Sequence, residues 1–424
     1  MKILASIILI FLYSIAFGQF DNSIFNNYKP INENDSLKLW FSFDNQNFLH
    51  NNEYFNNLYD GYTYLGYSIS PKLIFQPSSK IKLQAGWFFI KYSGRDKFWR
   101  SVPWFNCQYK FSKNVDLLLG NIHGTVEHKL IEPLYSFDKH FTNNPEQGIQ
   151  FLGNFKHFEG NLWLNWEKFI VPDDTFREEF TLASTSKLKF YKPESKFRIS
   201  IPLQGMATHK GGQGNSSSGY EQTYFNTVSG FELEYLPSIN SKNRFGTKNY
   251  FVTYTDASDK HVQYYSKGWG IYCNLFAKIG KFDFMAGYWY SQHFIAPRGE
   301  QLFQSVSEKY IIWWESNKQL ITSKLQFTHN INSGINIAIR AETYYDLIRY
   351  NFDFSYSLYV IINQDFFLHK ISFKNPFKHC WGYCSKFWTL GFMETFDVEY
   401  RSTGKRLARE FLIYLFRART ACLK

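Results

Sequence analysis

Beyond its first eighteen residues, this sequence lacks any long apolar run. A membrane-spanning helix needs about 20 consecutive, mostly apolar residues, so a helical membrane protein is excluded. The early run from Ile3 to Phe17 follows Met1-Lys2 and ends at the small residues Ala16 and Gly18. This pattern predicts a signal peptide over residues 1–18, cleaved on export. No cysteine follows it, so a lipid anchor at a new N-terminus is not expected.

Cysteine is also scarce, with five among 424 residues. Cys107 and Cys273 stand alone in strand-like patterns, and the other three lie beyond residue 379. No disulfide framework is therefore predicted, although the chain is exported.

Recognisable catalytic signatures are missing as well. The sequence contains no G-x-S-x-G, no H-E-x-x-H and no phosphate-binding loop. On this basis we predict that the protein is not an enzyme and that it needs no cofactor.

Room for an N-terminal plug domain is lacking too. Only 18 residues separate Gln19 from the first predicted strand, which excludes TonB-dependent transport, because that class fills a 22-stranded barrel with a plug. Residues 19–36 are predicted to be a short periplasmic segment. If the chain forms a barrel, residues Asn22 to Asp35 could at most enter its lumen.

The excess of positive charge is concentrated at one end. The formal net charge is +11, but residues 373–424 contain ten basic and four acidic residues. The rest of the chain is only mildly basic, so nucleic acid is not an expected partner.

Aromatic residues are abundant, although the mean hydropathy is only −0.35. The 45 Phe, 30 Tyr and 12 Trp residues fall in segments where apolar and polar residues alternate with a period of two. The set Ile335, Ile337, Ile339 and Ala341 is one example. Such alternation predicts strands whose two faces meet different surroundings, and Trp and Tyr suit a membrane boundary.

Very short polar links alternate with long ones between these segments, which is typical of outer-membrane barrels with short periplasmic turns and long outer loops. Sixteen strands are predicted, with both ends of the barrel in the periplasm; a further strand at 309–315 would raise the total to eighteen. The predicted strands are 37–45, 62–75, 80–92, 102–111, 115–121, 146–156, 161–170, 178–190, 196–206, 223–236, 247–256, 267–278, 281–290, 319–329, 335–346 and 351–363.

The fold class predicted is therefore all-β, a transmembrane antiparallel β-barrel over residues 37–368. Residues 369–424 form an atypical basic tail, which either is not native to the barrel or includes an amphipathic helix on anionic lipid over residues 405–420.

Taken together, the export signal, the strand pattern and the last strand rich in Phe and Tyr resemble porin-type barrels of Gram-negative bacteria. The segment from Gly120-Asn121 to Pro133 and the strand Leu162 to Glu167 are similar to uncharacterised barrels of Bacteroidota. The resemblance implies an outer-membrane location, contact with outer-membrane lipid and lipopolysaccharide, and insertion by the barrel-assembly machinery. Homo-oligomerisation is left open.

A barrel of this size can hold a water-filled lumen, so we predict a porin-like channel for passive diffusion of small hydrophilic solutes. Because alternate residues of each strand face the interior, charged residues of both signs are predicted to line the pore. This mixture does not favour strong ion selectivity. The predicted pore-lining residues are Lys72, Lys82, Lys110, Asp116, Glu167, Arg198, Glu234, Asp283, Lys324, Arg340, Glu342 and Asp353. The long loop 121–145 is the candidate constriction, through Lys129, Glu132, Asp138, Lys139 and His140.

Two alternatives remain open at this point. A loop-borne hydrolase or metal site could use His123, Glu127 and His128. A surface polysaccharide receptor or assembly barrel could stack sugars on Trp99, Tyr220, Trp313 and Trp314; these rings could equally belong to the aromatic girdle.

Overall fold

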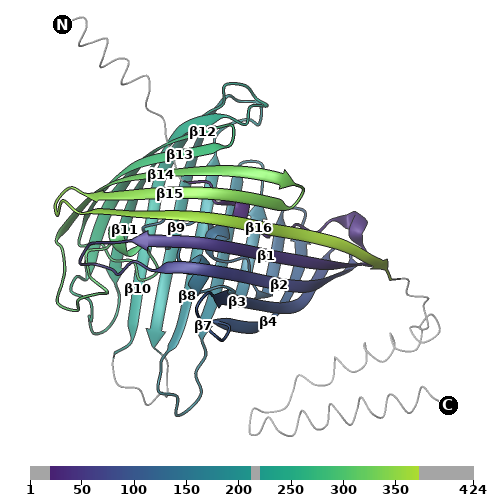
Figure 1. Ribbon diagram of the computed structural model, residues 1–424, viewed down its shortest axis with the longest axis horizontal. Coiled ribbons are helices and arrows are strands. Elements are labelled where there is room, and N and C mark those ends of the chain that lie inside the picture. The colour runs from purple at the N-terminus through teal and green to yellow at the C-terminus, as the bar shows by residue number, and fades with distance from the viewer. Residues whose placement is uncertain (1–19, 212–219, 372–424) are drawn as a thin grey trace, which may run out of the picture. The chain divides into compact units, whose positions relative to one another are not determined.

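Sixteen antiparallel strands close into one barrel in the computed structural model, which describes residues 20–211 and 220–371 (Figure 1). The strands are β1 (Lys38–Glu53), β2 (Thr63–Ser78), β3 (Ile81–Tyr92), β4 (Arg100–Ser112), β5 (Val115–Asn121), β6 (Gln147–Asn154), β7 (Phe158–Lys168), β8 (Glu178–Lys189), β9 (Phe197–Gly211), β10 (Gln222–Tyr235), β11 (Arg244–Asp256), β12 (Lys267–Ile279), β13 (Phe282–Gln292), β14 (Asn317–Asn332), β15 (Ile335–Asp346) and β16 (Phe352–Lys370). Short helices are η1 (Ser23–Phe25), η2 (Glu33–Asp35), η3 (Thr125–His128), α2 (Lys139–Thr142) and η4 (Gln301–Phe303).

Each strand pairs with its neighbours in the sequence, and β1 closes the barrel against β16. The fold class and the count of sixteen are confirmed. The segment 309–315 is not a barrel strand, because it takes part only in an isolated bridge between Val306 and Trp314. Among the described residues, no helix has the length and apolar character that a membrane crossing requires. The predicted signal peptide and most of the basic tail lie outside the described residues.

The first and last strands are longer than predicted. β1 extends to Glu53 instead of residue 45, and β16 extends to Lys370 instead of residue 363. In β1 the added part, Gln46 to Glu53, carries polar residues on both faces, so the alternation that identified the other strands is missing there.

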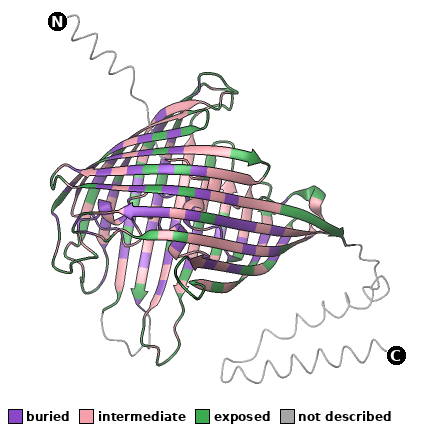
Figure 2. Cartoon of the chain, in the orientation of Figure 1, coloured by how far each residue is buried: buried purple, intermediate pink, exposed green. Residues whose placement is uncertain are grey.

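The outer and inner faces of the wall differ sharply in chemistry. Along β14, Ile321 and Leu325 are about half exposed on the outside, whereas Thr322 and Gln326 are buried inside. Buried and exposed residues alternate along many of the strands in Figure 2. This is the arrangement expected when hydrocarbon surrounds the barrel.

Two long loops fold into the barrel instead of standing above it. The 122–146 loop joins β5 to β6, and the 293–316 loop joins β13 to β14. Apolar side chains of both loops, among them Ile131, Leu134, Phe294 and Phe303, are completely buried against inward rings of the wall such as Trp289. The half of the interior nearer the long loops is therefore filled with protein.

The N-terminal segment enters the barrel from the short-turn end. Phe25 packs against Phe137 of the 122–146 loop and Tyr359 of β16. Asp21 pairs with Arg244 and Lys278 of the wall. Asp21 and Phe25 therefore contact the inner face of the wall.

A buried cation ties the 122–146 loop to the wall. Lys324 of β14 contacts Glu132 of the loop at 2.6 Å and Glu342 of β15 at 3.1 Å, and its side chain is 5% exposed. Removing one partner of a buried ion pair leaves uncompensated charge in a medium that solvates it poorly.

We expect Lys324→Met to lower the free energy of unfolding by about 3–5 kcal/mol, because it leaves the buried carboxylate of Glu132 without a cation and that of Glu342 with only Arg340, at 3.8 Å. Lys129→Met is the matched control. Lys129 also pairs with a carboxylate, that of Glu159, but its side chain is 62% exposed, so a loss of less than about 1 kcal/mol is expected. Urea titration of the protein refolded in detergent measures both; equal losses would contradict the assignment.

Candidate active site

The structure turns all twelve predicted pore-lining side chains toward the barrel interior, where many are paired. Glu167 contacts Arg298 of the 293–316 loop at 2.6 Å, and Lys72 contacts Asp44 of β1. Asp283 contacts Lys278 at 3.1 Å. That these residues govern passage of solutes stays a prediction.

The five predicted constriction residues lie in the part of the 122–146 loop that folds inward. Glu132 contacts Lys324, Asp138 contacts His50 of β1, and His140 contacts Gln46 of β1. Lys129 reaches Glu159 of β7, and Lys139 lies in the short helix α2. The loop packs directly against the wall here.

A cavity of about 910 Å³ remains in the barrel interior. Its walls come from the N-terminal segment, the 122–146 loop and strand residues near the short turns, including Lys113, Glu159, Lys189 and Asp283. This volume falls in the range of small-molecule sites.

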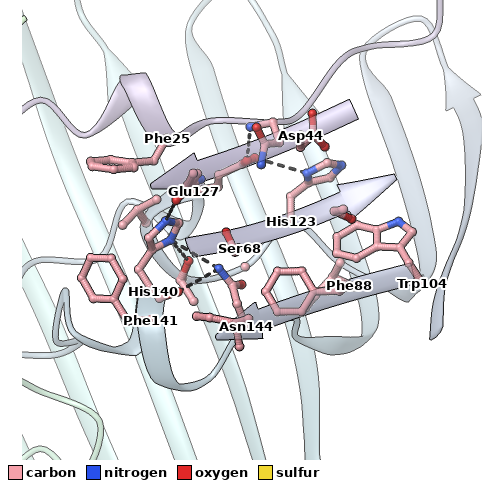
Figure 3. A pocket seen from close by; sticks show the side chains of 18 of the residues that line it. Phe25, Asp44, Ser68, Phe88, Trp104, His123, Glu127, His140, Phe141 and Asn144 are labelled. Carbon is pink, nitrogen blue, oxygen red and sulfur yellow. Dashed lines mark hydrogen bonds and ion pairs between the residues drawn. The ribbon is translucent and has the colours of Figure 1, made fainter. Parts of the chain in front are cut away.

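A smaller pocket of about 60 Å³ lies between the 122–146 loop and the wall of β1 to β4. Figure 3 shows its side chains, with His123 and Asp44 facing it from one side and His140 and Asn144 from another. Phe25, Phe88 and Phe141 give the pocket an apolar part.

Thr125 and His140 form a hydroxyl–imidazole pair in this pocket. Oγ1 of Thr125 lies 3.2 Å from Nδ1 of His140, whose Nε2 lies 2.7 Å from Oε1 of Gln46. Thr125 adopts a left-handed backbone conformation with φ of 50°, which is costly for a β-branched residue. Burial lowers the pKa of His140 to about 4, so this imidazole is neutral at physiological pH.

A second hydroxyl–imidazole pair includes a carboxylate and lies where β1 meets β16. Nδ1 of His50 is 2.6 Å from Oγ of Ser357, and Nε2 of His50 is 2.9 Å from Oδ1 of Asp138. Asn52 donates to the other oxygen of Asp138 at 2.8 Å. Since the carboxylate of Asp138 accepts a hydrogen bond from Nε2–H, Nδ1 carries no hydrogen and can accept a hydrogen bond from the serine hydroxyl. These are the three groups of a Ser–His–Asp triad, with the two ring nitrogens exchanged, because Nδ1 and not Nε2 of His50 faces the serine.

The register of the barrel sets this triad. His50 and Ser357 are direct cross-strand partners on β1 and β16, and Asp138 is brought to them by the inward fold of the 122–146 loop. The hydroxyl of Tyr359 also lies 3.1 Å from Nδ1 of His50. His50 is 1% exposed and Ser357 4%, so the imidazole and the serine hydroxyl are shielded from solvent.

Two aromatic rings of the pocket drawn in Figure 3 also contact residues of the triad or its neighbour Tyr359. Phe141 lines the pocket and stacks on His50 with 5.2 Å between ring centres. Phe25 also lines the pocket and contacts Tyr359 at 5.0 Å.

The three loop residues considered for a hydrolytic or metal site, His123, Glu127 and His128, do not form one group in the structure. His123 pairs with Glu127 at 3.4 Å, whereas His128 pairs with Glu146 at 2.8 Å and stacks on Trp163. Within residues 20–211 and 220–371, no group of three or more His, Cys, Asp or Glu residues is arranged to hold a metal ion. The four rings considered for sugar stacking lie on three different loops.

These features define an outer-membrane β-barrel whose interior is largely packed and contains hydroxyl–imidazole pairs. The chain belongs to the family of lipid A 3'-O-deacylase-type proteins, which matches residues 31–371. The prediction that the protein is not an enzyme is wrong, because this family is one of enzymes. That prediction relied on the absence of a short catalytic motif, and an active site assembled from distant parts of a chain need not contain one.

Solved structures similar to this one are outer-membrane proteins with low sequence identity. OprD from Pseudomonas aeruginosa is 10% identical, with 84% of this chain and 98% of that chain covered and a TM-score of 0.43. A loop-deletion mutant of OmpT from Vibrio cholerae is 10% identical, with coverage of 76% and 99% and a TM-score of 0.44. None of the curated proteins compared with this sequence matches it.

Sequence reasoning named Asp138 but missed His50 and Ser357. These two residues lie 307 positions apart, so only the pairing of the first and last strands brings them together. A usable signal was present: in a barrel that closes, inward polar residues of the first and last strands become neighbours.

A buried glutamate makes the packing of the two loops depend on pH. Glu300 of the 293–316 loop is 4% exposed, and Ser136 of the 122–146 loop donates to it at 2.7 Å. Burial, together with nearby Asp138 and Glu132, raises its pKa from 4.5 to about 8. The folded protein thus keeps a proton that the unfolded chain loses, so stability falls as pH rises from about 5 to about 8.

We expect Glu300→Gln to remove this loss, so that the variant gains in melting temperature over the parent protein as pH rises through that window. Thermal unfolding in detergent at a series of pH values measures it. Glu221→Gln, at an exposed glutamate, should follow the parent at every pH. A Glu300→Gln advantage that is constant with pH would contradict the prediction.

Proposed function

We propose that this protein is an outer-membrane hydrolase that cleaves an acyl ester of a lipid A-type glycolipid, with Ser357 as the nucleophile. The observation that carries the proposal is the hydrogen-bonded chain Ser357–His50–Asp138 in a member of a deacylase-type family.

The chemistry follows from the geometry of the triad. Oγ of Ser357 attacks the acyl carbon and its proton passes to Nδ1 of His50. The bond between the acyl carbon and the sugar oxygen then breaks, and the sugar oxygen takes that proton from His50. Water next attacks the acyl carbon of the acyl-serine ester while Nδ1 of His50 takes its proton. The bond between the acyl carbon and Oγ then breaks, Oγ of Ser357 takes that proton from His50, and the fatty acid is released. Asp138 stabilises the imidazolium in both steps.

The charge of the group behind each imidazole indicates which of the two hydroxyl–imidazole pairs holds the nucleophile. Asp138 supports a positive charge on His50, whereas His140 faces a neutral amide of Gln46 and has its pKa lowered to about 4 by burial. An imidazole that resists protonation is a poor base toward a hydroxyl. Thr125 is therefore the weaker candidate nucleophile.

Access to Ser357 requires the ring of Phe141 to move. Phe141 lies in α2 of the 122–146 loop, so the loop that supplies Asp138 also covers the serine. Binding of an acyl chain in the apolar part of the neighbouring pocket would displace this ring.

We expect Ser357→Ala to lower the rate of deacylation by on the order of 10⁴-fold or more, as loss of a triad nucleophile does. The purified protein is incubated with lipid A that carries a 3'-O-acyl chain, and mass spectrometry measures the loss of that chain. Thr125→Val is the matched control, because it removes the hydroxyl of the second pair, and it should retain most of the activity.

The outcomes separate the function from its nucleophile. If the parent protein leaves every acyl ester of lipid A intact, the proposed function is wrong. If Thr125→Val is inactive and Ser357→Ala is active, the hydrolase stands and Ser357 is not its nucleophile. Heat-modifiable migration on a gel verifies that each variant is a folded barrel.

Passive diffusion of small hydrophilic solutes is the second candidate function. It is favoured by the cavity of about 910 Å³, whose lining includes both cations and anions. The filled half of the interior near the long loops opposes it, because a diffusion pore needs a continuous aqueous path.

Planar-bilayer recording tests this second candidate. A diffusion pore gives discrete current steps that grow with salt concentration, whereas a packed barrel gives a silent bilayer. We expect no steps from the parent protein. Steps of uniform size at a given salt concentration would establish a channel. Their absence even at high salt would exclude the diffusion-pore function.

A further inference from the structure

Four consecutive short turns carry exposed lysines and almost no acidic residues. These turns follow β6, β8, β10 and β12, and they lie at the same end of the barrel because neighbouring strands are antiparallel. Together they contain five lysines and one acidic residue, Glu194. The five lysines, all exposed, are called the lysine arc: Lys156, Lys192, Lys196, Lys242 and Lys281. By contrast, the 93–99 and 169–177 loops at the opposite end each combine basic and acidic residues.

Hydrogen bonds between neighbouring turns hold the lysine arc in one continuous row. The carbonyl of His157, in the turn after β6, accepts from the backbone at the end of β8 at 2.9 Å. The N–H of Leu236 donates to the carbonyl of Lys196 at 2.8 Å. The N–H of Gly280 donates to Oδ1 of Asn243 at 2.8 Å. Each of the four turns is therefore bonded to the next, and their positive charges adjoin.

The ammonium groups of the lysine arc are not neutralised by acidic side chains. Within residues 20–211 and 220–371, no carboxylate forms an ion pair with any of the five lysines. Lys281 contacts the imidazole of His329 at 2.8 Å. Lysines on the inner face differ, since Lys187 of β8 pairs with Glu232 at 2.7 Å. The lysine arc can therefore bind an anion that the chain itself does not supply.

Phenylalanines on the outer face of the wall place the lysine arc at the edge of the hydrocarbon. Phe197 and Phe282 each directly follow a lysine of the arc, and they are 72% and 51% exposed at the start of β9 and β13. Phe158 lies two positions after Lys156 and is also exposed on the outer face. Rings that face lipid this close to the turns leave the lysines at the level of the head groups. There a lysine stem can lie along hydrocarbon while its ammonium group stays in the polar layer.

We propose that the lysine arc binds phospholipids with a net negative charge in the periplasmic leaflet, through hydrogen bonds from the ammonium groups to phosphate oxygens. The short-turn end of an outer-membrane barrel faces the periplasm, and lysines clustered beside a bilayer attract anionic lipid. The lipid-facing rings next to the lysines favour a membrane over the polysaccharide of the cell wall, which lies in water. The inference does not depend on the proposed hydrolase, because no residue of the triad belongs to these turns.

Spin-labelled lipids test this preference directly. The full-length protein is refolded into dimyristoylphosphatidylcholine vesicles that contain a trace of spin-labelled phosphatidylglycerol or spin-labelled phosphatidylcholine. Electron spin resonance then gives the fraction of each labelled lipid held at the protein surface. The test variant removes three charges of the arc: Lys192→Gln, Lys196→Gln and Lys242→Gln.

A matched control removes the same number of charges from exposed loops at the opposite end of the barrel. Its substitutions are Arg95→Gln, Lys97→Gln and Lys260→Gln. Because the two variants have the same net charge, a difference between them reports the position of the charges. Heat-modifiable migration on a gel verifies that both are folded barrels.

We expect the parent protein to hold phosphatidylglycerol about twofold more strongly than phosphatidylcholine, with a preference that weakens as salt screens the charges. The test variant should hold the two lipids almost equally, whereas the control should keep the parental preference. A test variant that keeps the full preference would overturn the proposal, as would equal losses in both variants. So would a parent protein without any preference that sediments with isolated peptidoglycan, because the lysine arc would then face the cell wall.

Discussion

The interior of a sixteen-stranded barrel is wider than the inward side chains of its own wall can fill, and the rest of this structure depends on how that space is occupied. In this protein it is occupied by protein. The 122–146 loop, the 293–316 loop and the N-terminal segment enter the barrel from its two ends and meet in the middle. Their apolar residues form a core, while ion pairs such as Lys324–Glu132 fix them to the wall.

This packing explains why one barrel can look like a porin in sequence and belong to a family of enzymes. Alternation along the strands reports only that hydrocarbon lies on one side and polar groups on the other. It is silent on whether those inward polar groups face water or hold a folded loop. Here Gln326 and Arg340 are buried next to each other, and Arg340 also packs on the ring of Phe137 from the 122–146 loop.

The strands were predictable from the sequence, while the site was predictable only in part. Fourteen strands between the first and the last follow the period of two closely, because each residue meets one of two distinct environments. The end of β1 escaped prediction because its inward residues pack on a loop and residues of its other face, Asn47 and Asn51, are also polar. For the site, Asp138 and His140 stood out as polar residues in a long loop. His50 and Ser357 did not, because their proximity is a property of barrel closure and the loop that completes the triad has no periodicity.

The position of the triad at the β1–β16 seam has a consequence for the life of the protein before it reaches its membrane. In the proposed hydrolase, the nucleophile and the base come from the two strands that are farthest apart in the chain, and Ser357 meets His50 only through their pairing. A partly folded chain in transit, with its first and last strands still separate, cannot assemble the reactive centre. Hydrolytic capacity would then appear together with the finished wall, which protects the lipids and carriers met during export from premature cleavage.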